Sequence, residues 1–236
     1  MIGCNCKVCE SKDPKDQRLR SSIYVEWDHF SLVVDTGPDF RQQMLREGIK
    51  SLDAVLFTHE HTDHVAGLDD IRAFNYFQKK PMDLFASDHT AADLKTRFGY
   101  AFGDYPGAPS IRLHEIHGGA FELGGNRVQP ISVMHRDLQV YGFRFGDFTY
   151  ITDANFISPE AEKLIRGSHT IVLNALRREK HYSHFNLEEA VEWIERLNPQ
   201  KGYFTHVSHQ LGLTEEINQE LPDTIELAYD GLSISF

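Results

Sequence analysis

The segment FTHEHTDHVAG, residues 57–67, constrains this chain more than any other feature. It places four ligand-type side chains directly after an apolar run: His59, His61, Asp63 and His64. Three of the chain's 13 histidines lie in this segment. Chance would give this pattern in such a chain only on the order of a few times in a thousand. A polar turn before a helix would explain one histidine but not the cluster, so the pattern indicates a metal site.

The spacing within the cluster suggests two neighbouring ions. Residues i and i+2 of an extended segment point the same way, so His59 and His61 can hold one ion together. The chain is then expected to turn into a helix, which directs Asp63 and His64 toward a second position. Imidazole and carboxylate ligands suit Zn²⁺, Mn²⁺ or Fe²⁺. Four residues cannot fill two coordination shells, so more ligands must come from elsewhere.

Three further ligand-type residues stand at the ends of apolar, strand-like runs. His135 ends PISVMH, Asp153 ends FTYITD and His206 ends GYFTH. Any one of them alone is more often a loop residue than a ligand. In this order, after the histidine cluster, we interpret them together as metal ligands.

The chain alternates strand and helix patterns without a linker that would divide it. Strands are expected at 30–35, 53–57, 82–87, 170–176 and 201–206. Helices are expected at 39–48, at 63–77 with Thr62 as N-cap, and at 89–98 with Asp88 as N-cap. The clearest helix begins at Asn186, with Glu189 at the capping-box position. The last residues, 226–236, are expected to form a hairpin around Asp230 and Gly231. Together these patterns predict one domain over residues 1–236, with sheets packed face to face and helices outside.

Composition limits the classes of partner. The formal net charge of −11 argues against a nucleic-acid partner, although a bound metal can attract a small anion. No apolar run is long enough to span a bilayer, and the N-terminus lacks the apolar region of a signal peptide. The three cysteines all lie within the first nine residues, which makes a disulfide framework improbable. We therefore expect a cytoplasmic protein.

The order of THEHTDH, His135, YITDA and His206 resembles the metallo-β-lactamase superfamily over nearly the whole chain. This resemblance implies an α/β (α+β) fold, a four-layer αββα sandwich, with two divalent ions that are Zn or Mn, or alternatively Fe or Ni. Two such ions can lower the pKa of a shared water and polarise a phosphoryl oxygen. The implied assignment is His59, His61 and His135 on one ion, Asp63, His64 and His206 on the other, and Asp153 bridging them.

Two more motifs resemble the PhnP-type cyclic-phosphate phosphodiesterases. GCNCKVC is similar to the N-terminal zinc motif of that branch, and THVSHQ places a histidine where the branch has its fourth zinc ligand. The resemblance thus implies one structural zinc on Cys4, Cys6, Cys9 and His209. Related sequences usually have a strand ahead of this motif, whereas Met1 and Ile2 stand directly before Gly3 here. We expect either that the strand is truly absent or that the sequence here starts after it.

The resemblance also implies the reaction. The substrate would be a small cyclic or nucleotide phosphodiester, Asp63 would serve the reaction as well as binding metal, and the protein would be a homodimer. His184 in HYSHFNLEEA resembles the general acid of these enzymes, with His181 as the alternative. Asp35 in VVDTGPDF would orient a metal-binding histidine. A tRNase Z-like endoribonuclease is the second hypothesis, although no Gly/Pro-rich basic insertion is present, and a non-catalytic metal-binding scaffold is the third.

Overall fold

The computed structural model describes residues 1–103 and 105–236. The chain forms two compact units, one made of Met1–Leu19 and Arg127–Phe236 and the other of Arg20–Asn126. Each unit has its own buried hydrophobic core. The expectation of a single domain over residues 1–236 stays a prediction.

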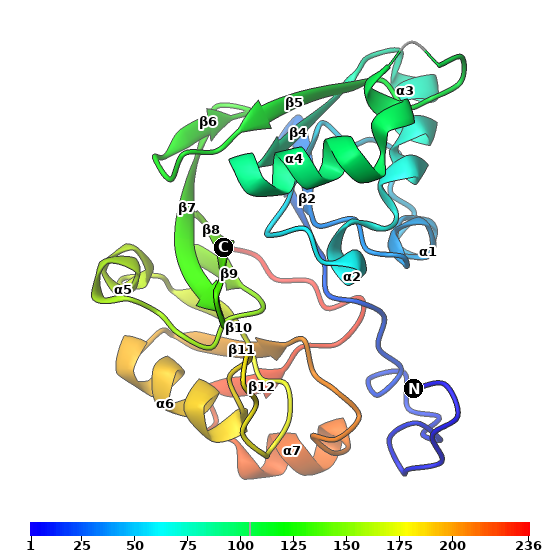
Figure 1. The fold of residues 1–236 in the computed structure, drawn as a ribbon. Helices are drawn as coiled ribbons and strands as arrows, with labels where there is room; N and C mark the ends of the chain where they lie inside the picture. The colour runs from blue at the N-terminus through cyan, green and yellow to red at the C-terminus, as the bar shows by residue number, and fades with distance from the viewer. Residues whose placement is uncertain (104) are drawn as a thin grey trace. The chain divides into compact units, whose positions relative to one another are not determined.

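The unit of residues 20–126 is built on a five-stranded sheet (Figure 1). The strand order is β1-β2-β3-β4-β5, with β1 antiparallel to β2 and the other neighbours parallel. The strands are β1 Ile23–Trp27, β2 Phe30–Val34, β3 Ala54–Leu56, β4 Met82–Ala86 and β5 Ile111–Glu115. Parallel strands end at the same edge of a sheet. The residues that follow β2 and β3, including the HEHTDH segment, therefore lie at one edge.

Helices cover one face of this sheet. They are α1 Phe40–Arg46, α2 Thr62–Val65, η1 Leu68–Ile71, α3 Arg72–Gln78, α4 Asp88–Arg97 and η2 Gly99–Phe102. Val33, Val55 and Leu84 of the strands share a buried cluster with Phe40 of α1 and Leu94 of α4. The alternate residues of these strands, which face the other side of the sheet, are fully buried as well: Leu32, Val34, Ala54 and Leu56. Burial of both faces explains why these strands read as continuous apolar runs.

The prediction of one continuous helix at 63–77 is wrong. The segment is broken into α2, η1 and α3, and the first break falls at Gly67, whose N–H donates to Thr36 O at 2.8 Å. A Cβ built on Gly67 would lie 2.2 Å from Gly37 O. This close backbone approach needs a glycine and interrupts the helix. The predicted caps are also each displaced by one residue, because His61 and Ser87 occupy the N-cap positions.

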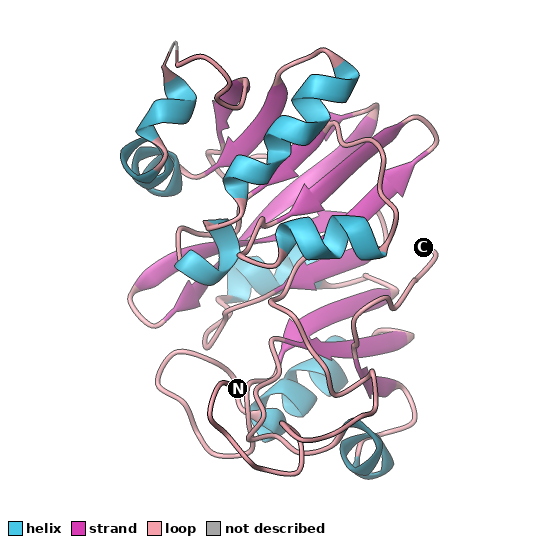
Figure 2. Ribbon diagram, turned by 90° about the vertical axis from the view of Figure 1, so that its right-hand side faces the viewer, coloured by secondary structure: helices cyan, strands magenta, loops and turns pink. Residues whose placement is uncertain are grey.

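The unit that holds residues 127–236 contains most of a seven-stranded sheet, in the order β12-β11-β10-β9-β8-β7-β6. Figure 2 shows the strands of the chain in magenta and its helices in cyan. The strands are β6 Phe121–Leu123, β7 Asn126–His135, β8 Leu138–Phe145, β9 Phe148–Ile151, β10 Thr170–Asn174, β11 Lys201–Thr205 and β12 Ile225–Leu227. Both β7 and β9 are antiparallel to β8, whereas β9 to β12 are parallel. Strands β7, β9, β10 and β11 therefore run in the same direction and end at one edge.

Three helices pack on this sheet: α5 Pro159–Ile165, α6 Leu187–Leu197 and α7 Thr214–Glu220. The start of α6 confirms the predicted capping box. Asn186 accepts from the Glu189 N–H at 2.9 Å, and the Glu189 carboxylate accepts from the Asn186 N–H at 3.1 Å. The sequence pattern did not predict α5.

The hairpin expected at 226–236 is wrong. Instead β12 pairs in parallel with β11, and residues 228–236 form no strand. The Asp230 carboxylate accepts from the backbone N–H of Leu19 at 3.1 Å. The Asp-Gly pair therefore contacts the N-terminal segment rather than closing a hairpin.

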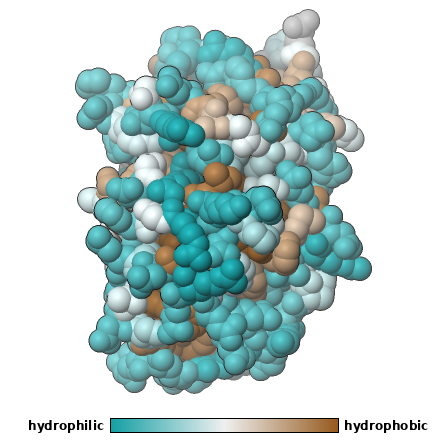
Figure 3. All heavy atoms as spheres, turned by 90° about the vertical axis from the view of Figure 1, so that its left-hand side faces the viewer, coloured by the Kyte–Doolittle hydropathy of each residue, from teal (hydrophilic) through white to brown (hydrophobic). Residues whose placement is uncertain are grey.

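Two further features are the apolar character of the helices and the distribution of hydrophobic residues on one face of the surface. None of the helices in residues 1–103 and 105–236 has the length and apolar character to cross a bilayer. On the face shown in Figure 3, hydrophobic atoms lie in small patches among hydrophilic ones. Single exposed apolar residues of this kind are normal on protein surfaces.

Candidate functional site

Asp35 anchors the HEHTDH segment from the end of β2. The carboxylate is fully buried and accepts from the backbone N–H and the hydroxyl of Thr58, both at 2.8 Å. It also lies 2.7 Å from His64 Nδ1. Burial raises the pKa of Asp35. The charge of His64 and the hydrogen bonds that Asp35 accepts from His64 and Thr58 act in the opposite direction. With Nδ1–H donating to the carboxylate, the imidazole lone pair of His64 is on Nε2, the arrangement found at metal-binding histidines. This contact agrees with the predicted role of Asp35.

The histidine rings of the segment lie close to one another. The ring centroid of His59 lies 4.5 Å from that of His61 and 4.3 Å from that of His64. His64 Nε2 lies 3.5 Å from Asp63 Oδ2. A nitrogen and an oxygen on one tetrahedral zinc ion would be about 3.4 Å apart, given usual bond lengths. The spacing of these two donors therefore fits a shared ion.

Glu60 fixes the middle of the segment. Its carboxylate accepts from the Thr90 hydroxyl at 3.1 Å and lies 3.2 Å from His89 Nε2, both near the start of α4. The sequence reading gave no role to Glu60. It anchors the backbone between two of the predicted ligands.

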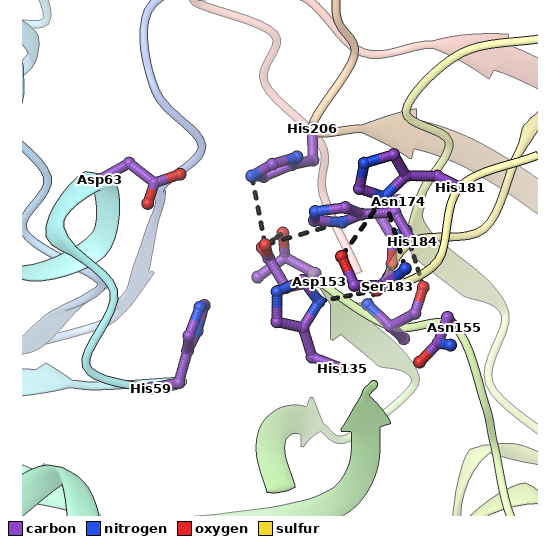
Figure 4. Close-up of polar contacts among 12 residues, drawn as sticks. His59, Asp63, His135, Asp153, Asn155, Asn174, His181, Ser183, His184 and His206 are labelled. Atoms are coloured by element: carbon purple, nitrogen blue, oxygen red, sulfur yellow. Dashed lines mark hydrogen bonds and ion pairs between the residues drawn. The ribbon is translucent and has the colours of Figure 1, made fainter. Parts of the chain in front are cut away.

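A second group of donors lies at the strand-end edge of the other sheet (Figure 4). His135, Asp153 and His184 are buried, and one ligand atom of each lies within 4.8 Å of the others. Asp153 Oδ1 lies 3.3 Å from His206 Nε2 and 3.7 Å from His184 Nδ1, and Oδ2 accepts from the Thr152 hydroxyl at 2.7 Å. The 3.3 Å separation again matches the spacing of about 3.4 Å expected on one tetrahedral ion. The donor set and its spacing fit a divalent metal.

The backbone at these positions is strained. Asp153 and His206 have φ values of 54° and 52°, in the left-handed region that non-glycine residues rarely adopt. Such conformations cluster at functional sites, where the surrounding structure holds them. His135 is held in another way, because its Nδ1 lies 2.7 Å from Ser183 O. That hydrogen bond places the proton on Nδ1 and leaves Nε2 as the donor atom for a metal.

His184 fits two roles. Its side chain is buried, and among the described residues its Nδ1 has no hydrogen-bond partner. Burial lowers the pKa of His184 to about 3, Asp153 opposes this shift, and three neighbouring histidines add to it. A neutral imidazole with an unused nitrogen can bind metal or, once protonated beside a bound phosphate, donate a proton. His181 is less buried, and its Nδ1 lies 3.3 Å from the Ser183 hydroxyl.

The N-terminal cysteines meet His209 in a third cluster. The Sγ atoms of Cys4 and Cys6 lie 3.5 and 3.4 Å from His209 Nδ1, and Cys9 completes a group whose ligand atoms lie within 4.8 Å of one another. Sulfur and nitrogen on one tetrahedral zinc would be about 3.6 Å apart. A hydrogen bond from the Cys9 backbone, and then one from His209, lower the pKa of Cys6 to about 6. Because zinc binds the thiolate, these residues fit a closed structural site.

We expect Cys6→Ser to lower the zinc content by one ion per chain. The N-terminal segment has no helix or strand, but it is also held by Asp16, which accepts from the Thr214 N–H at 2.8 Å at the start of α7. Loss of zinc should therefore loosen residues 1–12 without unfolding the chain, as measured by elemental analysis and hydrogen exchange. The control is Lys12→Ala at an exposed position in the same segment, which leaves all four ligands and the Asp16 anchor in place. Unchanged zinc content in Cys6→Ser would contradict the site.

The comparisons with known proteins were made by sequence and by structure. The profile of the Beta-lactamase superfamily domain matches residues 31–207. A crystal structure of a diphosphatase from the PhnP family is 41% identical with a TM-score of 0.94, and the match covers 100% of this chain and 91% of that one. This likeness confirms the predicted fold class.

Two relatives differ from each other in their described activity and in the share of their length that this chain covers. An octanoyltransferase from Porphyromonas gingivalis is 36% identical over 98% of this chain, but the chain spans only 48% of that protein. A ribonuclease Z from Mycobacterium sp. (strain KMS) is 25% identical over 78% of this chain and 76% of that protein.

Proposed function

The chain belongs to the metallo-β-lactamase superfamily and is a metal-dependent hydrolase, and from this premise we propose that it hydrolyses small phosphodiesters or diphosphates at a dinuclear metal site. The observation that carries the proposal is the 41% identity, over the whole chain, to a protein described as a PhnP-family diphosphatase. The Cys₃His cluster supports the same branch, because its motif resembles the N-terminal zinc motif of PhnP-type enzymes and its four ligand-type residues lie together.

Seven side chains are proposed to hold the two ions: His59, His61, Asp63, His64, His135, Asp153 and His206. When bound, two such ions lower the pKa of water and stabilise negative charge on a phosphoryl group. The metals are Zn or Mn in this proposal. A separate structural zinc is proposed on the cysteine cluster.

The protein's own groups would orient the ligands and move one proton. Asp35 and Ser183 O hold His64 and His135 with Nε2 as donor atom. His184 is proposed to protonate the leaving oxygen, a step that general acids typically accelerate 10²–10⁴-fold. In the unliganded protein its pKa is about 3, so the negative charge of a bound phosphate would have to raise it.

Two bonds are candidates for cleavage. The PhnP resemblance favours a cyclic or nucleotide phosphodiester, whereas the similarity to a diphosphatase favours the P–O–P bond of a diphosphate. Both reactions attack a phosphorus that carries one negative charge and two bridging oxygens, so one set of ligands can serve either. The substrate is therefore proposed to be a small molecule. The protein is proposed to work in the reducing cytoplasm, which suits three cysteines that form no disulfide.

Purified protein loaded with Mn²⁺ or Zn²⁺ is expected to hydrolyse bis(p-nitrophenyl) phosphate, and the activity should disappear with EDTA and return with metal. A panel of 2′,3′-cyclic nucleotides and nucleoside-diphosphate sugars would separate the two bonds. A 3′-extended precursor tRNA cleaved far faster than every small substrate would instead select the ribonuclease Z alternative. Full metal content without turnover on any of these substrates would support a non-catalytic scaffold.

A further inference from the structure

Asn174 ends β10 with a fully buried side chain. Its amide makes two hydrogen bonds to the backbone of a single residue. Oδ1 accepts from the N–H of Ala154 at 2.7 Å, and Nδ2 donates to the carbonyl oxygen of Ala154 at 2.9 Å. Ala154 directly follows Asp153 in the chain, so the first bond fixes the peptide group that joins the two residues.

The backbone of Asp153 has an uncommon conformation. Its φ of 54° lies in the left-handed region, which few non-glycine residues adopt, although aspartate does so more often than most. The Thr152 hydroxyl occupies Oδ2, so Oδ1 is the atom directed toward His206 and His184. Fixing the peptide after Asp153 therefore fixes the direction in which this oxygen points.

The same carbonyl connects to the histidine loop. The oxygen of Ala154 also accepts from the N–H of Phe185 at 2.8 Å, directly after His184. Ala154, Asn174 and Phe185 are all buried. One amide side chain thus holds the backbone that carries Asp153 and, through Ala154, the backbone next to His184.

We propose that Asn174 is a positioning residue, whose two hydrogen bonds to Ala154 aim Asp153 Oδ1 at the metal and thereby set the affinity for metal. The inference rests on the proposed function in one respect, since it takes Asp153 to be a metal ligand. Residues that orient metal ligands are typically worth 10- to 100-fold in metal affinity.

The test is a calorimetric titration of the metal-free full chain with Mn²⁺. Asn174→Ala is expected to bind it 10- to 100-fold more weakly than the unaltered chain does. The matched control is Asn75→Ala. The Asn75 amide makes the same pair of bonds to Ser110, each at 3.0 Å, but lies outside the proposed ligand set. The control should lower the melting temperature and leave the metal affinity unchanged.

A second variant keeps the proposal testable if Asn174→Ala does not fold. Asn174→Asp retains the acceptor for the Ala154 N–H but sets a carboxylate oxygen against the Ala154 carbonyl. Its Mn²⁺ affinity is expected to lie between those of the unaltered chain and of Asn174→Ala. Metal affinity equal to that of the unaltered chain in a folded variant would overturn the proposal. The titration contains no substrate, so a chain that binds two ions but hydrolyses nothing would overturn the proposed function alone.

Discussion

Replacing Asp153 by Ala is expected to remove at least one bound active-site metal and to lower hydrolysis by at least about 10³-fold. Asp153 is the proposed bridging ligand, and changes to residues that merely orient a ligand already cost 10- to 100-fold. As the proposed bridge it would contribute to both ions, and its Oδ1 lies 3.3 Å from Nε2 of His206, a proposed ligand of one of them. Elemental analysis and initial rates on bis(p-nitrophenyl) phosphate measure the two effects.

The control for this change is Asp147→Asn. Asp147 stands in the turn between β8 and β9, and its exposed carboxylate lies 3.5 Å from His169. Exposed ion pairs contribute little to stability, so this variant should keep its metal and its activity. An Asp153→Ala protein with full metal content and full turnover would remove Asp153 from the site.

Replacing His184 by Ala is expected to lower kcat by about 10²–10⁴-fold on a diester with an alkyl leaving group, the range typical of general acid catalysis. The effect should be small with a p-nitrophenyl leaving group, because that phenolate leaves without being protonated. Metal content should stay unchanged. The comparison of the two leaving groups separates proton donation from a structural effect, which would slow both substrates equally.

The same variant discriminates the second role that the geometry allows. His184 Nδ1 lies 3.7 Å from Asp153 Oδ1, close enough for both to bind one ion. If His184 were a ligand, His184→Ala would lose metal and would slow both substrates. His181→Ala serves as the comparison, since its ring centroid lies 5.1 Å from that of His184. A leaving-group effect in His181→Ala and none in His184→Ala would reverse the assignment.

The sequence indicated where candidate ligands stand more readily than it indicated the path of the chain. His135, Asp153 and His206 could be selected because each follows an apolar run, and the structure gives the reason: β7, β9 and β11 end at the same edge. The break at Gly67 was not predictable, because the helical pattern continues through it. Only the close approach of Gly37 O, which lies distant in sequence, interrupts the helix.

The supporting residues were harder to find. Asn174 ends a strand and looks like any polar turn residue, and Glu60 looks like one more charge in a polar loop. Their roles depend on contacts with Ala154 and Thr90 that no local pattern encodes. The terminal Asp-Gly pair was misread for the same reason, because Asp230 contacts Leu19. Local patterns thus indicate which residues carry chemistry but not which residues hold them.

Hydrolysis is expected to require two metal ions held by this chain. This expectation is tested most directly by adding Mn²⁺ stepwise to metal-depleted protein, with the structural zinc retained, while the hydrolysis rate of bis(p-nitrophenyl) phosphate is measured. We predict that activity rises until two equivalents per chain are bound and then stays constant. Full activity at one equivalent, or no hydrolysis at any metal content, would contradict the account.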